Sequence, residues 1–558
     1  MANGADLIAE KIVQQGLKRV FLFPGGTIAP ILETLEKRGV ELFVARHEQG
    51  AGYAALAVAR LTGQPQVVLV TSGPGVTNIA TVVADAYYDS TPLIVMCGQV
   101  GTADLSRSSE LRQRGFQEVP TTKLYEYLSK DTYQPTCAED LAHDLHAAFW
   151  LAAEGRPGPV VLDIPMDVQR KETTCPLGIG NYLPSASWLD DMSEVAEMLA
   201  SAKRPVIIAG QGVLLDRAQE ELRWLVDTTQ IPVSHSLLGI GALPKSHPLN
   251  LGYHGHTGSQ VAGKAIYNAD LLLVLGSRLD VRQTGTETAR FAPRASIVRV
   301  DIDMPEIQHT RVKTNLQICA CVGETLRKLN TAIGPTADKH AWHAEIAAWR
   351  KEFVIDNFAS RALRAVQVVQ ELDAATQNQA VTVVTGVGLH QQWVARHFSF
   401  NYPWRTLLTS GGHGAMGYDL PSAIGAQLYD TERLVLCIVG DGSFQMNIQE
   451  LATVAEHEMP LKIFVLNNFR LGIVSQFQNL NWKRDLTCGN KYNPDFSSIA
   501  KAYGIRSYTT DSVAHLRKVL GIVLQDDKPV VVNCLCDPKE DITPMLLAGQ
   551  TIDKMWTA

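Results

Sequence analysis

Three observations on the sequence predict an α/β protein with three doubly wound parallel-sheet domains. The chain has 558 residues, and at roughly 100 to 200 residues per domain it is too long for one compact core. Short β-branched runs alternate with amphipathic stretches of about 12 residues along nearly the whole length, which is typical of parallel sheets covered by helices. Gly-rich turns follow strand-like runs in both the first and the last third, which indicates two related folds.

The first domain is expected at residues 1–170. It opens with a helical pattern at 5–15 and carries the punctuated segment Gly155-Arg-Pro-Gly-Pro159 near its end. Its strands are predicted at 20–23, 41–45, 66–71, 92–97 and 159–164, with helices between them. The stretch 171–191 contains Pro, Gly, Ser and Asn with little periodicity, and we therefore expect a linker there.

The second and third domains follow the same pattern. The central domain, expected at 190–335, has predicted strands at 205–209, 231–235, 270–275 and 296–301. A charged helical region at 339–357 separates it from the third domain, expected at 361–540. Strands of the third domain are predicted at 381–385, 405–409, 434–439, 461–466 and 530–535, and residues 541–558 are expected to form a C-terminal tail.

Composition excludes several classes of protein. The net charge is −7 and no run of five like charges occurs, so the electrostatic footprint of a nucleic-acid-binding protein is missing. The longest apolar runs fall far below the roughly 18 residues of a membrane helix, so no membrane partner is expected. The 9 cysteines form no C-x-x-C pair and are expected to be reduced, mostly buried thiols. The N-terminus enters a helical pattern without a charged leader, and we expect a cytoplasmic location.

The segment Gly440-Asp441-Gly442, followed by Asn467-Asn468, carries the most specific chemical signal. The apolar runs on either side predict two strands, and apolar residues at helical spacing between them predict a helix, so the segment is one βαβ unit. A right-handed crossover makes the two strands parallel. Asp441 and Asn468 then emerge together at the carboxyl ends, where open α/β sheets bind ligands.

These two side chains predict a magnesium site. A carboxylate and an amide oxygen, completed by water and phosphate oxygens, suit Mg²⁺ that is bound through a diphosphate. The backbone N–H groups of Gly442 and Ser443 open the helix and can bind the anion. A plain strand-to-helix turn is the alternative for a Gly-Asp-Gly segment alone. The Asn-Asn pair after the second strand favours the metal site over that alternative.

A second Gly-rich segment, Gly412-His-Gly414-Ala-Met-Gly417, fits the pattern G-x-G-x-x-G. It follows a predicted strand and precedes a helix that starts near Leu420, which by itself would indicate a dinucleotide fold. The acid that this fold requires about 20 residues later is supplied only by Asp441, which already belongs to the stronger motif. We therefore favour the diphosphate–magnesium interpretation over a nicotinamide site.

The Gly-Asp-Gly and Asn-Asn pattern resembles the motif of thiamine-diphosphate enzymes, and the rest of the chain supports that resemblance. It implies that Asp441 and Asn468 ligate Mg²⁺, with the backbone carbonyl of Arg470 as a third ligand. It also implies that the Gly414 carbonyl accepts from the 4′-amino group of the cofactor and that Met416 forces the cofactor into its bent shape. A core methionine is the structural alternative for Met416.

Glu48, in Arg46-His47-Glu48-Gln49-Gly50, stands where a predicted strand gives way to a helix. An acid at a helix start is favoured by the helix dipole, which is the simple alternative. Together with the turn Thr71-Ser-Gly73-Pro-Gly-Val-Thr-Asn78, the segment resembles the pyrimidine-binding domain of thiamine enzymes. The resemblance implies that Gly73 and Asn78 contact the cofactor and that Glu48 hydrogen-bonds the pyrimidine N1′. This bond favours the tautomer whose 4′ nitrogen takes the C2 proton.

Flanking segments narrow the resemblance to catalytic subunits of the acetolactate synthase family. They are Phe23-Pro-Gly25-Gly26, Ala84-Asp-Ala-Tyr, Asp89-Ser90, Gly115-Phe116-Gln117-Glu118, Gly155-Arg-Pro-Gly-Pro159 and Leu546-Leu-Ala-Gly-Gln550. That family decarboxylates pyruvate on thiamine diphosphate and transfers the hydroxyethyl carbanion to a second 2-keto acid.

The resemblance to this family also implies roles in catalysis and substrate binding. Gly25 and Phe116 would lie at the catalytic centre, and Gln117 would orient the intermediate. Arg282 would pair with the carboxylate of the acceptor, a task suited to a bidentate guanidinium, although a surface arginine is the alternative. Phe477 and Ile473 are the other predicted substrate residues.

The central domain resembles the region in which the family holds FAD without a redox role. Its predicted flavin-binding residues are Gly210, Gly212, Arg278 and Asp301. Two positions depart from the family pattern, because Gln211 interrupts a glycine triplet and Val281 replaces an acid. Thiamine relatives without flavin also exist, so FAD is expected here with that alternative open.

Three further departures concern the active site. Leu389 stands where the family usually has a diphosphate-binding glutamine, which leaves His390 and the helix start to bind phosphate. Met166 replaces a lysine and Phe477 replaces a tryptophan, at positions that shape substrate entry and selection. The identity of the keto acid and of the acceptor is therefore open.

Two other functions compete with the favoured one. The first is another thiamine-diphosphate-dependent ligase or decarboxylase, with a different 2-keto acid or an aldehyde acceptor. The second is a catalytically silent relative that binds nucleotide or flavin, which the joint presence of Glu48, Asp441 and Asn468 argues against. The superfamily resemblance also implies a homodimer or a dimer of dimers, in which Glu48 of one chain reaches the cofactor held by another. Whether a regulatory subunit binds is left open.

Overall fold

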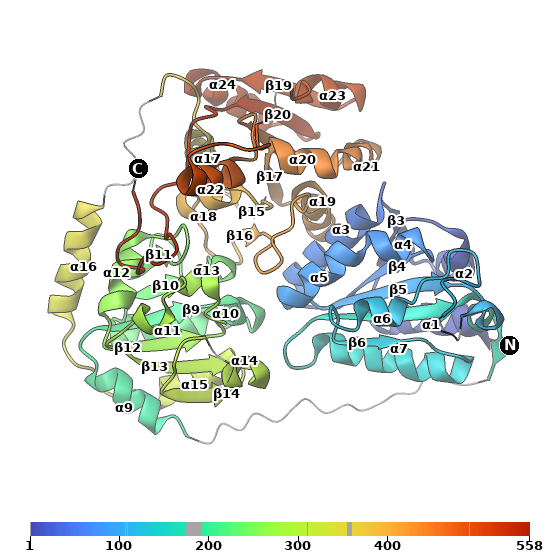
Figure 1. The fold of residues 1–558 in the computed structure, drawn as a ribbon, viewed down its shortest axis with the longest axis horizontal. Helices are drawn as coiled ribbons and strands as arrows, with labels where there is room; N and C mark the ends of the chain where they lie inside the picture. The colour runs from blue at the N-terminus through green and yellow to red at the C-terminus, as the bar shows by residue number, and fades with distance from the viewer. Residues whose placement is uncertain are drawn as a thin grey trace.

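Three six-stranded parallel sheets, each with helices on both faces, make up the computed structural model of the chain (Figure 1). The structure describes residues 2–106, 108, 110–174, 191–309, 311–353, 360–489 and 492–557. The predicted α/β class with three doubly wound sheets is confirmed. The predicted linker at 171–191 lies almost entirely outside the described residues, as does the end of the helical region predicted at 339–357.

The N-terminal sheet has the strand order β3-β2-β4-β5-β7-β6. The strands are β2 (Arg19–Leu22), β3 (Glu41–Val44), β4 (Gln66–Val70), β5 (Leu93–Gln99), β6 (Asp131–Tyr133) and β7 (Pro159–Pro165). Every residue of β4, β5 and β7 is buried, because helices cover both faces. One face carries α1 (Gly4–Gln14), α2 (Ala29–Lys37) and α7 (Ala138–Ala153). The other carries α3 (Glu48–Thr62), α4 (Pro74–Asn78) and α5 (Ala80–Tyr88).

The C-terminal sheet repeats this order as β16-β15-β17-β18-β20-β19. Its strands are β15 (Val381–Val384), β16 (Arg405–Leu408), β17 (Leu434–Gly440), β18 (Lys462–Asn467), β19 (Arg506–Thr510) and β20 (Val530–Leu535). Helices α17 (Ala365–Ala375), α18 (Leu389–His397) and α24 (Val513–Val523) share one core. Helices α19 (Asp419–Tyr429), α20 (Asp441–Met446), α21 (Leu451–Glu456) and α23 (Phe496–Ala502) lie on the other face. Numbered within each sheet, both orders are 2-1-3-4-6-5, which confirms the predicted kinship of the first and third units.

The central sheet has a different order, β11-β10-β9-β12-β13-β14, which is 3-2-1-4-5-6 in its own numbering. Its strands are β9 (Pro205–Ala209), β10 (Val233–His235), β11 (Asn250–Tyr253), β12 (Leu271–Leu275), β13 (Ser296–Asp301) and β14 (Leu316–Cys319). Helices α9 (Ser193–Ser201), α11 (Gln219–Thr229) and α15 (Val322–Ala332) pack on one face. Helices α12 (Gln260–Asn268) and α16 (His340–Glu352) pack on the other. This is the strand order of Rossmann folds, whose ligand crevice opens between the first and fourth strands.

Four strands of the six-stranded sheets were absent from the sequence prediction, and each lies at the edge of its sheet: β6, β11, β14 and β19. The prediction also missed β1 (Ala2–Asn3) and β8 (Glu172–Thr173), which pair antiparallel in a separate two-stranded sheet, so the first residues of the predicted linker form a short strand. Edge strands are half exposed, so they lack the continuous apolar run that marks a buried strand. The helix predicted between β17 and β18 is also interrupted, since α20 ends at Met446 and α21 begins at Leu451.

The N- and C-terminal units share one hydrophobic core through α3 and α19. Small residues allow the close approach: a Cβ added to Gly425 of α19 would lie 2.1 Å from the carbonyl oxygen of Ala54 in α3. The C-terminal tail returns to the central unit, where the Leu546 N–H donates to the His256 carbonyl at 2.7 Å. No helix in the described part of the chain has both the length and the apolar character needed to cross a membrane. The eight cysteines within the described ranges are free thiols.

Candidate active site

Asp441 and Asn468 meet at the carboxyl ends of two neighbouring strands. Strands β17 and β18 pair in parallel, with Gly440 opposite Leu466, so the residues that follow each strand emerge side by side. Both side chains are buried and line a small cavity of about 40 Å³. The βαβ geometry predicted for this motif is therefore confirmed.

The carboxylate of Asp441 has a partner that the motif did not reveal. The Nδ2 of Asn493 donates to Asp441 Oδ2 at 2.6 Å and to Asn467 Oδ1 at 2.9 Å. Asn493 lies beyond α22 (Gly472–Trp482), in a loop without regular periodicity. Only spatial proximity connects it to the Gly-Asp-Gly turn. An amide that holds one carboxylate oxygen fixes the direction of the other.

The wall of the small cavity is set by a buried hydrogen-bond network around Asp419. Its carboxylate accepts from the Gly386 N–H and the Ser443 hydroxyl, and it lies 3.2 Å from His390 Nε2. The Ser443 hydroxyl in turn accepts from the Gly417 N–H at 2.8 Å. The hydroxyl of Ser443 is thus engaged, and its backbone N–H is the group it can offer to a ligand.

The cavity wall also contains most of the other residues predicted to bind cofactor or metal in this domain, with Gly414 as the exception. They are His390, Met416, Gly442, Ser443 and Arg470, together with Ile473 from the predicted substrate set. Leu389 faces inward and packs on Gly472, where an added Cβ would lie 2.4 Å from the leucine Cδ1. The Arg470 side chain pairs with Asp541 in the C-terminal segment, with Nη2 2.6 Å from Asp541 Oδ1. This ion pair anchors the turn that carries Asn468.

Glu48 lies in the N-terminal domain as the first residue of α3 and is 4% exposed. Asn78 Nδ2 donates to Glu48 Oε2 at 3.0 Å, so two residues of the predicted pyrimidine site are in direct contact. Gly73 has φ +65°, and an added Cβ there would lie 2.8 Å from the Cβ of Gln117. Gln117 itself has φ +63°, a left-handed conformation that costs energy for any residue with a side chain.

The structure thus brings Glu48 and Asn78 together and places Gln117 against Gly73. Gly25 lies against Thr71, where an added Cβ would be 2.3 Å from the threonine Cβ. Phe116 is 85% exposed. Within the described ranges, the small cavity is lined only by residues between 387 and 474, so none of these N-terminal residues reaches it in the same chain.

The loop that carries Gln117 rests on a buried acid. Asp163, at the end of β7, accepts from Gln99 Nε2 at 3.1 Å and from Gln134 Nε2 at 2.6 Å, and Gln99 Nε2 also donates to the Val119 carbonyl. Burial raises the pKa of Asp163 to about 6, and the amide donors oppose that rise. Sequence periodicity gave no signal for this network.

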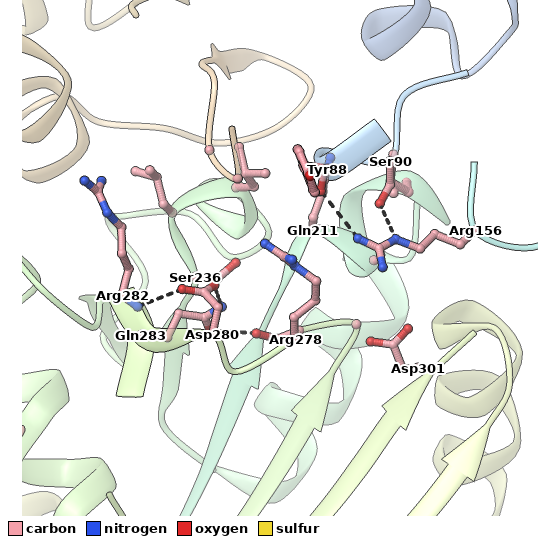
Figure 2. Close-up of a pocket in the computed structure, with 18 of the residues that line it drawn as sticks. Tyr88, Ser90, Arg156, Gln211, Ser236, Arg278, Asp280, Arg282, Gln283 and Asp301 are labelled. Carbon is pink, nitrogen blue, oxygen red and sulfur yellow. Dashed lines mark hydrogen bonds between the residues drawn. The ribbon is translucent and has the colours of Figure 1, made fainter. Parts of the chain in front are cut away.

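A larger cavity of about 640 Å³ lies between the central domain and both of its neighbours (Figure 2). It opens beside the loops that follow β9 and β12, where the strand order of the central sheet reverses. Its lining includes five predicted residues: Gly212, Arg278, Arg282 and Asp301 of the central domain and Gly414 of the C-terminal domain. Figure 2 shows Tyr88, Ser90 and Arg156 of the N-terminal domain facing Arg278 and Asp301 of the central domain. Gly210 is outside the lining: an added Cβ would lie 2.1 Å from the Gly276 carbonyl oxygen, so this glycine serves the close approach of two loops.

Charged groups surround the larger cavity. Arg156 donates to Ser90 Oγ at 2.8 Å and pairs with Asp303 and Glu306, which joins the first domain to the second. Burial raises the pKa of Asp301, while the Asp303 N–H and Arg299 oppose the rise. Burial lowers the pKa of His254 to about 4, and its Nε2 has no hydrogen-bond partner among the described residues. A buried, neutral imidazole at the wall is a group that a ligand can engage.

Phe477 lies outside both cavities. It sits on α22, is 53% exposed, and contacts Trp482 edge-on with ring centroids 5.7 Å apart. Ile473, one turn earlier on the same helix, lines the small cavity. The helix therefore connects the small cavity to the exposed ring.

Comparison with known proteins agrees with this arrangement. Three family models match: the N-terminal TPP binding domain of thiamine pyrophosphate enzymes at 2–124, their central domain at 192–329 and their C-terminal TPP binding domain at 386–534. The chain is 36% identical to the acetolactate synthase isozyme 1 large subunit of Escherichia coli (strain K12), over 99% of this chain and 97% of that protein. It is 35% identical to the acetolactate synthase large subunit of Lactococcus lactis, over 99% and 96%. It is also 35% identical to the mitochondrial acetolactate synthase catalytic subunit of Aspergillus candidus, over 98% and 82%.

Proposed function

The chain belongs to the thiamine pyrophosphate enzymes, with acetolactate synthase catalytic subunits as its relatives, and from this premise we propose how its residues act. It is a thiamine-diphosphate-dependent carboligase that decarboxylates a 2-keto acid and joins the remaining two-carbon unit to a second 2-keto acid. The assignment of roles rests on one observation: Asp441, Asn468 and His390 are buried and line the same pocket. Bound thiamine diphosphate supplies the nucleophilic carbon for this chemistry.

The pocket fits a magnesium diphosphate. Asp441 and Asn468 offer hard oxygen ligands, with the Arg470 carbonyl as the third, and phosphate and water oxygens would complete the shell. Leu389 offers no hydrogen bond where the family usually has glutamine. The anion is therefore left to His390, the start of α18 and the N–H groups of Gly442 and Ser443.

Glu48 would hold the proton at the pyrimidine N1′. Its Oε2 is occupied by the amide of Asn78, which orients the carboxyl group and leaves Oε1 for the ring. Burial excludes water from this contact, so the bond to the ring has little competition. Gln117, held in its left-handed conformation against Gly73, would orient the reacting groups.

We propose that the working site is shared by two chains. Glu48 and the small cavity lie in separate places within one chain, so a second copy would supply the acid that the diphosphate-bound cofactor needs. The exposed ring of Phe116 would then lie at the junction between the two copies. A homodimer is thus the smallest active unit under this proposal.

The larger cavity fits a dinucleotide such as FAD. Its volume falls within the range of small-molecule sites, and it lies at the switch point of a Rossmann-type sheet. Arg278 can bind a diphosphate, Asp301 can accept from ribose hydroxyls, and His254 has an uncommitted nitrogen at the wall. We propose that FAD is held here.

Arg282 and Phe477 are the proposed acceptor contacts. Arg282 lines the larger cavity and offers a guanidinium to the carboxylate of a 2-keto acid. Phe477 offers a smaller ring than the tryptophan that the family usually has, which favours pyruvate as both donor and acceptor.

One assay tests the function. Purified protein is incubated with pyruvate, thiamine diphosphate and Mg²⁺, and the products are identified by mass spectrometry. Acetolactate together with CO₂ is the expected result. Decarboxylation without acetolactate, or ligation only when an aldehyde is added, would instead support the alternative of a thiamine enzyme with another acceptor.

A further inference from the structure

Two buried acids at the end of α5 face the Gly-rich turn that follows β16. Asp85 and Asp89 are one helical turn apart and fully buried. A single guanidinium serves both: Arg60 Nη2 lies 2.6 Å from Asp89 Oδ2 and 4.0 Å from Asp85 Oδ1. Burial raises the pKa of Asp85, and the charge of Asp89 adds to that rise. Two buried carboxylates beside one cation are costly for stability, so their presence calls for a further role.

The acids and Arg60 hold the turn by its backbone. Asp89 accepts from the N–H groups of Gly411 at 2.8 Å and Gly412 at 2.6 Å. Asp85 accepts from the Ser410 hydroxyl at 3.0 Å. Ser410 Oγ in turn accepts from two further N–H groups, those of Gly414 at 3.1 Å and Ala415 at 3.0 Å.

This network leaves little freedom to the turn. Arg60 Nη1 donates to the Thr409 carbonyl, and the His413 ring stacks on Tyr88, the last residue of α5. A Cβ added to Gly412 would lie 3.0 Å from Asp89 Oδ1, so a side chain there would push the carboxylate off its donors. Groups of the N-terminal domain therefore fix the backbone of Thr409, Gly411 and Gly412, and Ser410, held by Asp85, fixes that of residues 414 and 415. The turn also forms a wall of the larger cavity, through Gly411 to Gly414.

We propose that Asp85 and Asp89 are positioning residues that hold the 410–415 turn so that the Gly414 carbonyl accepts from the 4′-amino group of thiamine. This inference rests on the proposed function, in which Gly414 has that role. Carboxylates suit the task because they only accept, bind several donors at once and form stronger hydrogen bonds than neutral groups do. The same acids hold a turn that lines the larger cavity.

The test compares two variants that loosen the turn with one that does not touch it. Asp89→Asn removes the charge and one acceptor from Gly411 and Gly412, and Ser410→Ala removes the acceptor from Gly414 and Ala415. The control is Asp373→Asn, which weakens a partly exposed Asp–Arg pair with Arg405 at the opposite end of β16. Three properties are measured with thiamine diphosphate and Mg²⁺ alone: cofactor affinity by calorimetry, the near-ultraviolet circular dichroism of the bound aminopyrimidine, and hydrogen–deuterium exchange at C2.

Both turn variants are expected to slow C2 exchange by about tenfold, the effect of one lost hydrogen bond, and to change the aminopyrimidine spectrum. Cofactor affinity should stay within about threefold, because the diphosphate contacts are untouched. Asp373→Asn should match the wild type, and Ser410→Thr, which keeps the hydroxyl, should restore exchange. Wild-type exchange in Ser410→Ala would overturn the proposal, whether or not Asp89→Asn folds. Glu48→Gln is measured in parallel: if it leaves exchange unchanged, the proposed function itself fails.

Discussion

At the scale of single residues, Glu48 carries the most specific role. Its buried carboxyl is oriented by Asn78, so the neutral amide in Glu48→Gln keeps the shape of the site. The amide cannot share the N1′ proton, and we expect C2 exchange in the bound cofactor to slow by at least about 100-fold, within the range of acid–base contributions. Calorimetry should show nearly unchanged cofactor binding. Unchanged exchange would remove Glu48 from the mechanism.

Asp441 is the charged ligand of the proposed metal site. Asp441→Ala removes that ligand and leaves the amide of Asn493 without its carboxylate partner. We expect Mg²⁺-dependent cofactor affinity to fall by more than about 100-fold, since changes behind a metal ligand already cost about 10- to 100-fold. Titration calorimetry with Mg²⁺ present measures this. Wild-type affinity in the variant would contradict the metal assignment.

Phe477 is the proposed selector of the acceptor. A phenyl ring buries less surface on the extra methylene of 2-ketobutyrate than an indole does, and one buried methylene is worth about 0.8 kcal/mol, or roughly fourfold. Pyruvate should therefore compete well with 2-ketobutyrate, and Phe477→Trp should raise the preference for 2-ketobutyrate. The preference is measured as the ratio of the two ligation products at equal concentrations of pyruvate and 2-ketobutyrate. A wild-type preference of about fiftyfold for 2-ketobutyrate, far beyond the methylene estimate, would point to another selector.

Sequence patterns predicted the site residues that lie within recognisable motifs. They did not predict the residues that come close to the site only when the chain is folded. Asp441 and Asn468 were predicted to meet because two strands and a crossover lie between them, and they do. Asn493 contacts Asp441, and Asp163 supports the Gln117 loop through Gln99, in both cases across long sequence distances, so no periodicity marks them. Asp89 was noted as part of a family pattern, and its contact with the 411–412 turn became evident only in three dimensions.

At the scale of elements, the contact between α3 and α19 holds the first and third domains together. Gly425→Ala would place a Cβ 2.1 Å from the Ala54 carbonyl oxygen, which is backbone and cannot move aside. We expect a loss of about 1 to 3 kcal/mol in stability, seen as a lower unfolding temperature by calorimetry. The control is Gly521→Ala in α24, where nothing lies within 4 Å of the added Cβ. Gly521→Ala should raise stability by about 0.5 to 1 kcal/mol. Equal changes in unfolding temperature in the two variants would show that the close approach of α3 and α19 does not contribute to stability.

Most of the strands that could be predicted are buried on both faces, although the half-exposed edge strand β3 was predicted as well. Residues of β5, β12 and β17 form continuous apolar runs because helices cover both sides of each sheet. The four strands missed from the six-stranded sheets lie at sheet edges and are partly exposed, so their composition resembles that of loops. The order of the strands within each sheet could not be predicted from the sequence and is known only from the structure. The shared Gly-rich layout of the outer domains did indicate that these two domains are related.

At the scale of the whole molecule, two domains of the same topology each carry one half of the proposed site. The N-terminal sheet presents Glu48 and Asn78, and the C-terminal sheet presents Asp441 and Asn468. Within one chain these halves are separate, because the described lining of the small cavity contains no N-terminal residue. The central domain adds the larger cavity between them.

The central claim is that one working site needs Glu48 of one chain and Asp441 of another, and the most direct measurement is complementation between two inactive variants. Glu48→Gln and Asp441→Ala chains are mixed under conditions in which subunit exchange is demonstrated with differently labelled copies. Acetolactate formation from pyruvate is then measured. Activity should reappear, because one site of each hybrid dimer contains both wild-type residues. Exchange without any recovery of activity would contradict a shared site.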